Sequence, residues 1–180
     1  MNQDCKNLWA SSPTNNPINI IITGGTIDKK YNMLTGEVDF NQTSYIPQIL
    51  TQSRVDRDIQ TTTLFLKDSL DITLQDREDI LKAIKISTTK HIIITHGTDT
   101  MVESAKYISS YNINKVIILI GAMIPYSINH SDGLFNFGTA IGAVDYLDNG
   151  VYIAMNGKIF NSNNVYKNRE IGIFNTTKQR

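Results

Sequence analysis

Three short apolar runs constrain the fold of this 180-residue chain more than any other feature. Residues 18–23, 91–95 and 115–120 are rich in isoleucine, and a glycine follows each of them within two residues. Because both faces of these runs are apolar, they are typical of strands that are covered on both sides in a parallel sheet. We expect two further strands at 61–66 and 151–155.

Amphipathic helical patterns separate the apolar runs. They cover residues 71–86, 99–111 and 131–147. In the first of them, Thr73 followed by Asp76 is a signal for a helix start. Strands that alternate with helices of this length predict a doubly wound α/β fold, with a mainly parallel sheet and helices on both faces.

The chain is long enough for one domain with a substantial core. We therefore expect a single domain at 18–180, preceded by a disordered polar tail at 1–17 that is rich in Asn, Ser and Pro. The polar stretch at 28–44 is expected to be a functional or mobile loop. Near the end, Asn156-Gly157 between two apolar runs predicts a C-terminal β-hairpin.

Composition excludes several classes of partner. The 17 basic and 17 acidic residues cancel, so net charge favours neither a nucleic acid nor an anionic membrane. The single cysteine, Cys5, cannot form a disulfide within the chain or a zinc cluster based on cysteines, and it fits a reducing compartment. Residues 1–17 lack the apolar core of a signal peptide, and no apolar run approaches the roughly 20 residues of a membrane span. We expect a cytoplasmic protein without a membrane partner.

Polar residues follow the expected strands where a doubly wound sheet collects its ligands, at the carboxyl ends of the strands. These segments are 23–26, 67–71, 95–100 and 121–123. Turn glycines and helix N-caps explain any one of them taken alone, whereas all of them at one edge favour a site. A nucleotide site is disfavoured, because the segment TGGTID lacks both the third glycine of the dinucleotide fingerprint and the Gly-Lys-Ser/Thr of a P-loop.

A hydroxyl nucleophile is the other candidate. Thr26 lies on a glycine-rich turn, and Tyr31 could supply a phenolic partner. Thr98 and Asp99 offer a second hydroxyl beside a carboxylate. The basic nitrogen that such a nucleophile needs is missing nearby, since His96 is as well explained as a polar core residue.

The same segments resemble the two signatures of the bacterial-type L-asparaginases, TGGTI after the first strand and HGTDTM after the third. The resemblance continues through GAMIP, SDGLFNFG and GVYIAMNGKIF, and it covers roughly residues 18–170. It implies an asparaginase-like catalytic domain that needs no metal or organic cofactor. The catalytic residues that it implies are Thr26 as nucleophile, Tyr31 as its assistant, and the group Thr98, Asp99 and Lys167, in which the lysine supplies the missing base.

The resemblance also implies a substrate and its binding residues. Asparagine would lose its side-chain ammonia through a β-aspartyl ester on the threonine, with Ser69 holding the α-carboxylate and Asp99 the α-ammonium. The remaining substrate-binding positions that it implies are Gly25, Asp68, Gly97, Thr98 and Ala122. Glutamine differs by one methylene, worth about 1–3 kcal/mol of discrimination, so glutamine or another amide stays open as substrate.

This sequence departs from the family pattern in length and at one residue. Family members usually run to about twice this length, and their second domain lends an acidic residue to a neighbour's site. Here Leu70 stands where a glutamine commonly binds the α-amino group, which resembles the short, single-domain asparaginases. We therefore expect a homo-oligomer, with Asp68 as a possible substitute for the acid. A binding module of the same fold without catalysis is the alternative.

Overall fold

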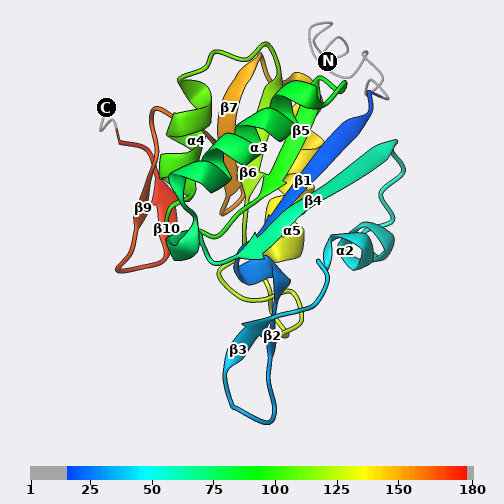
Figure 1. The fold of residues 1–180 in the computed structure, drawn as a ribbon, viewed down its shortest axis with the longest axis vertical. Coiled ribbons are helices and arrows are strands. Elements are labelled where there is room, and N and C mark those ends of the chain that lie inside the picture. Colours follow the sequence, from blue (N-terminus) through cyan, green and yellow to red (C-terminus); the bar gives the residue numbers. More distant parts are fainter. Residues whose placement is uncertain (1–15, 178–180) are drawn as a thin grey trace, which may run out of the picture.

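The computed structural model describes residues 16–177, so the predicted tail lies outside the described residues except for its last two. A six-stranded sheet forms the centre of the molecule in the order β4-β1-β5-β6-β7-β8 (Figure 1). Every pair in it is parallel except β7 with β8. The strands are β1 (Ile18–Gly24), β4 (Ile59–Lys67), β5 (His91–Thr95), β6 (Val116–Ile120), β7 (Gly150–Met155) and β8 (Lys158–Asn161).

Alternating isoleucines of the central strands feed two separate cores, one on each face of the sheet. Ile21, Ile92 and Ile94 pack on one face, whereas Ile20 and Ile93 pack on the other. The first face is covered by α3 (Leu74–Ile86) and α4 (Met101–Ser109), and the second by α5 (Gly133–Ala143) and α2 (Ile46–Gln52). The predicted α/β fold with helices on both faces is confirmed, because strands buried on both sides need cover on both sides.

The predicted helices are present, with shifted ends. A capping box forms at α3, in which the Thr73 hydroxyl accepts from the Asp76 amide and the Asp76 carboxylate accepts from the Thr73 amide. The expected helix at 71–86 therefore begins only at Leu74, and Ser69–Asp71 forms the short 3-10 turn η2 before it. The last predicted helix ends as a 3-10 turn, η3 (Val144–Tyr146).

The predicted hairpin joins β7 to β8. Asn156 and Gly157 both have positive φ, 55° and 70°, as the two central residues of a type I′ turn require. A second antiparallel pair follows that the sequence did not predict, formed by β9 (Tyr166–Asn168) and β10 (Ile173–Asn175). Among the described residues, no helix is both long and apolar enough to cross a membrane.

The polar stretch at 28–44 is not an irregular loop. It forms a small antiparallel ladder of β2 (Lys29–Tyr31) and β3 (Val38–Phe40), which projects beyond the carboxyl edge of the sheet (Figure 1). We call 29–40 the projecting hairpin. It starts directly after a 3-10 turn, η1 (Thr26–Asp28), so the turn that carries Thr26 also leads the chain into the hairpin.

Candidate active site

Two glycines at the end of β1 bring the first predicted segment against its neighbours. Gly24 and Gly25 have φ of 93° and 84°, which side-chain-bearing residues rarely adopt. A Cβ on Gly25 would lie 2.4 Å from the Gly97 amide nitrogen, so the two backbones touch only because no side chain intervenes. Thr26 therefore starts η1 beside the segment that carries Thr98.

Gly97 likewise allows a close approach, in this case by the loop after β4. A Cβ on Gly97 would lie 2.7 Å from the Ser69 Cβ. Ser69 is buried, and its hydroxyl accepts a hydrogen bond of 3.1 Å from the Asp99 amide. The Thr100 hydroxyl in turn donates to the Ser69 carbonyl oxygen over 2.6 Å. Three loops that are far apart in the sequence are thus locked together at one edge of the sheet.

Lys167 reaches this edge from β9 and contacts both residues predicted to work with it. Its Nζ lies 2.8 Å from Thr98 Oγ1 and 2.8 Å from Asp99 Oδ1. The lysine side chain is only 10% exposed, against 35% for that of Asp99. The Thr98 hydroxyl itself points at Met123 Sδ, 3.6 Å away. Thr98, Asp99 and Lys167 therefore form one hydrogen-bonded group of hydroxyl, carboxylate and amine.

Thr26 and Tyr31 have no such partners. Among residues 16–177, neither hydroxyl has a hydrogen-bond partner, and Thr26 is only partly buried. Tyr31 is 56% exposed on β2, with its hydroxyl near Gly36 in the turn of the projecting hairpin. The structure thus positions Thr26 beside the hydrogen-bonded group and leaves Tyr31 outside it.

A buried carboxylate anchors the base of the projecting hairpin. Asp28 Oδ1 accepts from the Ser44 hydroxyl and from the Tyr45 amide, both at 2.8 Å. Its other oxygen, Oδ2, is buried without a partner among the described residues. Burial raises the pKa of Asp28 above its ordinary value, although the bonds from Tyr45 and Ser44 oppose this. These bonds therefore anchor the start of the projecting hairpin at Asp28.

Asp68, predicted as a substrate-binding residue, is paired with a lysine of that hairpin. Lys29 Nζ lies 2.5 Å from Asp68 Oδ2, and the side chains are 19% and 30% exposed. Burial alone would raise the pKa of Asp68, but the hydrogen bonds from Lys29 and from the Leu70 and Ser69 amides, together with the charge of Lys29, outweigh it and hold this pKa below its usual range. This ion pair links the projecting hairpin to the residue directly before Ser69.

His96 is a buried neutral residue of the core. Its Nδ1 donates to the Gly97 carbonyl oxygen over 2.8 Å, which leaves Nε2 without a proton. Desolvation lowers the pKa of His96 to about 4. The imidazole contacts none of the predicted catalytic side chains through a hydrogen bond in the described part of the chain. Its hydrogen bond to the Gly97 carbonyl oxygen supports the turn at Gly97.

Ala122 was predicted to bind substrate, but its side chain is not available for binding. Its methyl group is fully buried in the core on the α5 face. The neighbouring Met123 and the loop around it are held by Asp132, which accepts from the Met123 and Ile124 amides at 2.8 and 3.0 Å. Sequence analysis placed Met123 at this edge without a role and missed Lys29 and Asp132. An aspartate just before a helix, in the segment SDG, was the one usable signal among them.

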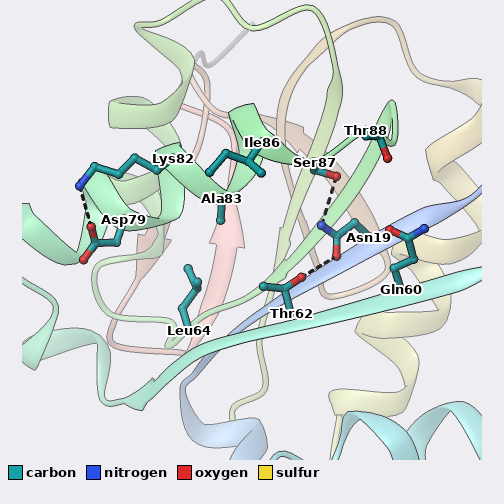
Figure 2. Close-up of a pocket in the computed structure, with 10 residues that line it drawn as sticks. All are labelled: Asn19, Gln60, Thr62, Leu64, Asp79, Lys82, Ala83, Ile86, Ser87 and Thr88. Atoms are coloured by element: carbon teal, nitrogen blue, oxygen red, sulfur yellow. Dashed lines mark hydrogen bonds and ion pairs between the residues drawn. The ribbon is translucent and has the colours of Figure 1, made fainter.

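A cavity of the described chain lies away from this edge. A cavity of about 470 Å³ lies between the outer strand β4 and the C-terminal half of α3. Figure 2 shows Asn19 on its floor, bonded to Thr62 on one wall and to Ser87 on the other. None of the predicted site residues lines it. The candidate site is therefore argued from the hydrogen-bonded group at the carboxyl edge and not from this cavity.

Comparison with known proteins matches this chain to a family model and to relatives that are asparaginases. The family model of the asparaginase N-terminal domain matches residues 17–175. L-asparaginase 2 of Escherichia coli is 30% identical over 165 residues, which are 83% of this chain and 46% of that protein. L-asparaginase 1 of the same organism is 31% identical over 160 residues, with 83% and 47% covered.

Solved structures show the same likeness. The thermostable L-asparaginase from Thermococcus kodakarensis superposes with a TM-score of 0.81 at 27% identity, over 91% of this chain and 52% of that one. A probable cytoplasmic L-asparaginase from Campylobacter jejuni gives 0.75 at 26% identity, over 89% and 53%. The chain spans about half the length of the relatives it matches.

Proposed function

This chain belongs to the asparaginase family, and from that premise we propose that it hydrolyses L-asparagine to L-aspartate and ammonia. The observation that carries the proposal is the group of Thr98, Asp99 and Lys167, hydrogen-bonded within 2.8 Å and packed beside the turn of Thr26. An amine in contact with both a hydroxyl and a carboxylate, next to a second hydroxyl, provides what a threonine nucleophile needs.

In the proposed reaction, the Thr26 hydroxyl oxygen attacks the side-chain amide carbon of asparagine. The carbon–nitrogen bond then breaks, and ammonia leaves with the proton that the threonine gives up. Water hydrolyses the resulting β-aspartyl ester and restores the hydroxyl. Tyr31 assists Thr26 in the first step.

Lys167 supplies the base for water. In its neutral form, its nitrogen accepts the Thr98 proton while the hydroxyl of Thr98 takes one from the attacking water. The lysine side chain is only 10% exposed and contacts Asp99 as well as Thr98. Its amine therefore lies within hydrogen-bonding reach of the one hydroxyl that it would deprotonate.

The substrate's charged groups have partners on the same edge. We propose that Ser69 binds the α-carboxylate, that Asp99 binds the α-ammonium, and that the close-packed Gly25 and Gly97 let the substrate approach the backbone. Asp68 adds negative charge beside Ser69, moderated by Lys29. Ala122 contributes through its backbone, since its side chain belongs to the core.

The projecting hairpin must move for Tyr31 to act. Its hydroxyl is exposed, and only an inward movement of 29–40 brings it to Thr26 and excludes water from the ester. The Lys29–Asp68 ion pair lies at the pivot of this movement.

The test is ammonia release from L-asparagine and from L-glutamine by the wild-type chain and by Thr26→Ala. We expect turnover of asparagine by the wild type and none by the variant, with unchanged circular dichroism. Turnover that survives in T26A refutes the nucleophile. Absence of any amide hydrolysis, combined with calorimetric binding of L-aspartate, would instead identify a binding module.

We also propose that the protein acts in the cytoplasm, as the probable cytoplasmic L-asparaginase of Campylobacter jejuni does by its name, and that it works as a homo-oligomer. Light scattering measures the assembly, and fractionation of the producing cells measures the location. A monomer at working concentration, or recovery outside the cytoplasm, contradicts the respective proposal.

A further inference from the structure

A chain of two asparagines, Asn136 fully buried and Asn156 partly buried, connects the two hydrogen-bond partners of Thr98. One partner is Lys167 on β9, and the other is Met123 in the loop after β6. These partners come from separate parts of the sequence, and neither is held by the strands of the central sheet. Something else must fix both relative to Thr98.

Asn156 holds the strand pair that carries Lys167. Its side-chain oxygen accepts a hydrogen bond of 2.9 Å from the Phe174 amide. Phe174, on β10, is the direct cross-strand partner of Lys167 on β9. Because the side chain of Phe174 is fully buried in the core, this bond fixes the short β9–β10 pair at its centre.

Asn136, fully buried on α5, joins Asn156 to the Met123 loop. Its side-chain oxygen accepts from the Asn156 amide over 3.0 Å, and its Nδ2 donates to the Gly121 carbonyl oxygen at 3.0 Å. The same Nδ2 donates to Asp132 over 2.9 Å, and Asp132 holds the Met123 amide. The Asn136 amide group thus makes three hydrogen bonds, two as donor and one as acceptor.

We propose that Asn156, supported by Asn136, is a positioning residue for the base Lys167. The proposal rests on the function proposed above, in which Lys167 takes the proton of Thr98. Lys167 is held in the β9–β10 pair, whose edges have no further strand among the described residues. Loss of the Asn156 side chain frees the Phe174 amide and lets this pair shift. A shift of about 1 Å between reacting groups costs up to about a hundredfold in rate.

Asn156→Gly is the test variant, because glycine keeps the φ of 55° and removes only the side-chain acceptor. We expect kcat for asparagine to fall about ten- to a hundredfold with KM little changed. The limb of the pH profile that reports the base should shift as well. Asn156→Asp keeps an oxygen acceptor at the same backbone position and should restore most of kcat.

Asn112→Gly is the matched control. Asn112 also has a positive φ, 47°, lies just beyond α4 and makes no side-chain hydrogen bond among the described residues. Its substitution should leave kcat unchanged. Equal kcat in N156G and wild type, or an equal loss in N156D and N156G, would overturn the proposal.

A readout without activity separates this proposal from the proposed function. Hydrogen exchange of the Phe174 amide should be slow in the wild type and in N156D, and fast in N156G. If the wild type hydrolyses no amide, the proposed function fails while this measurement still shows whether Asn156 holds β10. A rapidly exchanging Phe174 amide in the wild type overturns the inference, even where N156G does not fold.

Discussion

The two threonines of the candidate site lie in contrasting surroundings. Thr98 is bonded to Lys167 and directed at Met123, and its neighbours Asp99 and Ser69 are bonded to each other. We call Ser69, Thr98, Asp99 and Lys167 the assembled side. Thr26 has no side-chain partner in the described chain, and Tyr31 is exposed on the projecting hairpin. These two residues are the open side.

The difference follows from the structural elements on which each side is built. The assembled side is built on the ends of the parallel strands β4 and β5 and on a strand pair fixed in the core through Phe174, so its geometry exists before any substrate arrives. The open side depends on a hairpin of three-residue strands, anchored at Asp28 and paired at Lys29. In the proposed mechanism, the groups that activate water are therefore preassembled, and the nucleophile becomes competent only upon closure.

Removal of the base should have the largest effect. Lys167→Met keeps the length of the side chain and removes the amine, so we expect kcat to fall by about 10²–10⁴. Pre-steady-state ammonia release should survive better than steady turnover, because the first step uses Thr26. The control is Lys158→Met, which changes an exposed lysine of β8. Loss of the first ammonia in K167M would show that the two sides do not divide the reaction in this way.

His96, which bonds to Gly97 next to the assembled side, should make the stability of the folded protein depend on pH. The pKa of His96 is about 4 in the folded protein and 6.5 in an unfolded chain. Between these values the unfolded chain binds a proton that the folded one does not, so the free energy of unfolding decreases as pH falls from 6.5 toward 4. The full difference amounts to about 3 kcal/mol.

Urea unfolding at pH 7 and pH 4.5 measures this dependence. His96→Gln, which retains a donor for the Gly97 carbonyl, should remove most of the difference. An NMR titration should find the imidazole neutral down to a pH of about 5. A His96 that titrates near 6.5 in the folded protein would contradict the buried, neutral role that we assign to it.

The sequence predicted the assembled side better than the open side, for physical reasons. Strands buried on both faces carry an isoleucine pattern, and parallel strands bring their carboxyl ends to one edge, so the segments around Ser69 and Thr98 could be placed together. Lys167 could be assigned only by resemblance, because β9 is three residues long and has no periodic pattern.

Thr26 and Tyr31 were named from the sequence, but the projecting hairpin that carries Tyr31 was not predicted. The stretch 28–44 is polar and lacks alternation, so it was expected as a loop, yet it forms β2 and β3. The Lys29–Asp68 pair joins residues 39 positions apart, and no local pattern encodes such a contact. The contacts of Asn136 and Asn156 were missed for the same reason.

Closure of the open side gives the smallest effect and the most direct test of the comparison. Tyr31→Phe removes one hydroxyl whose partner is gained only upon closure, so we expect kcat to fall about tenfold, the equivalent of one hydrogen bond of about 1.4 kcal/mol. L-Aspartate should slow tryptic cleavage after Lys30, on β2, in the wild type and in Y31F alike, since the Lys29–Asp68 pair and not the phenol holds the hairpin. Cleavage that is indifferent to L-aspartate, in a protein shown by calorimetry to bind it, would mean that the hairpin does not close. Thr26 would then have to react in the open geometry described here, and the distinction between an assembled and an open side would lose its mechanistic meaning.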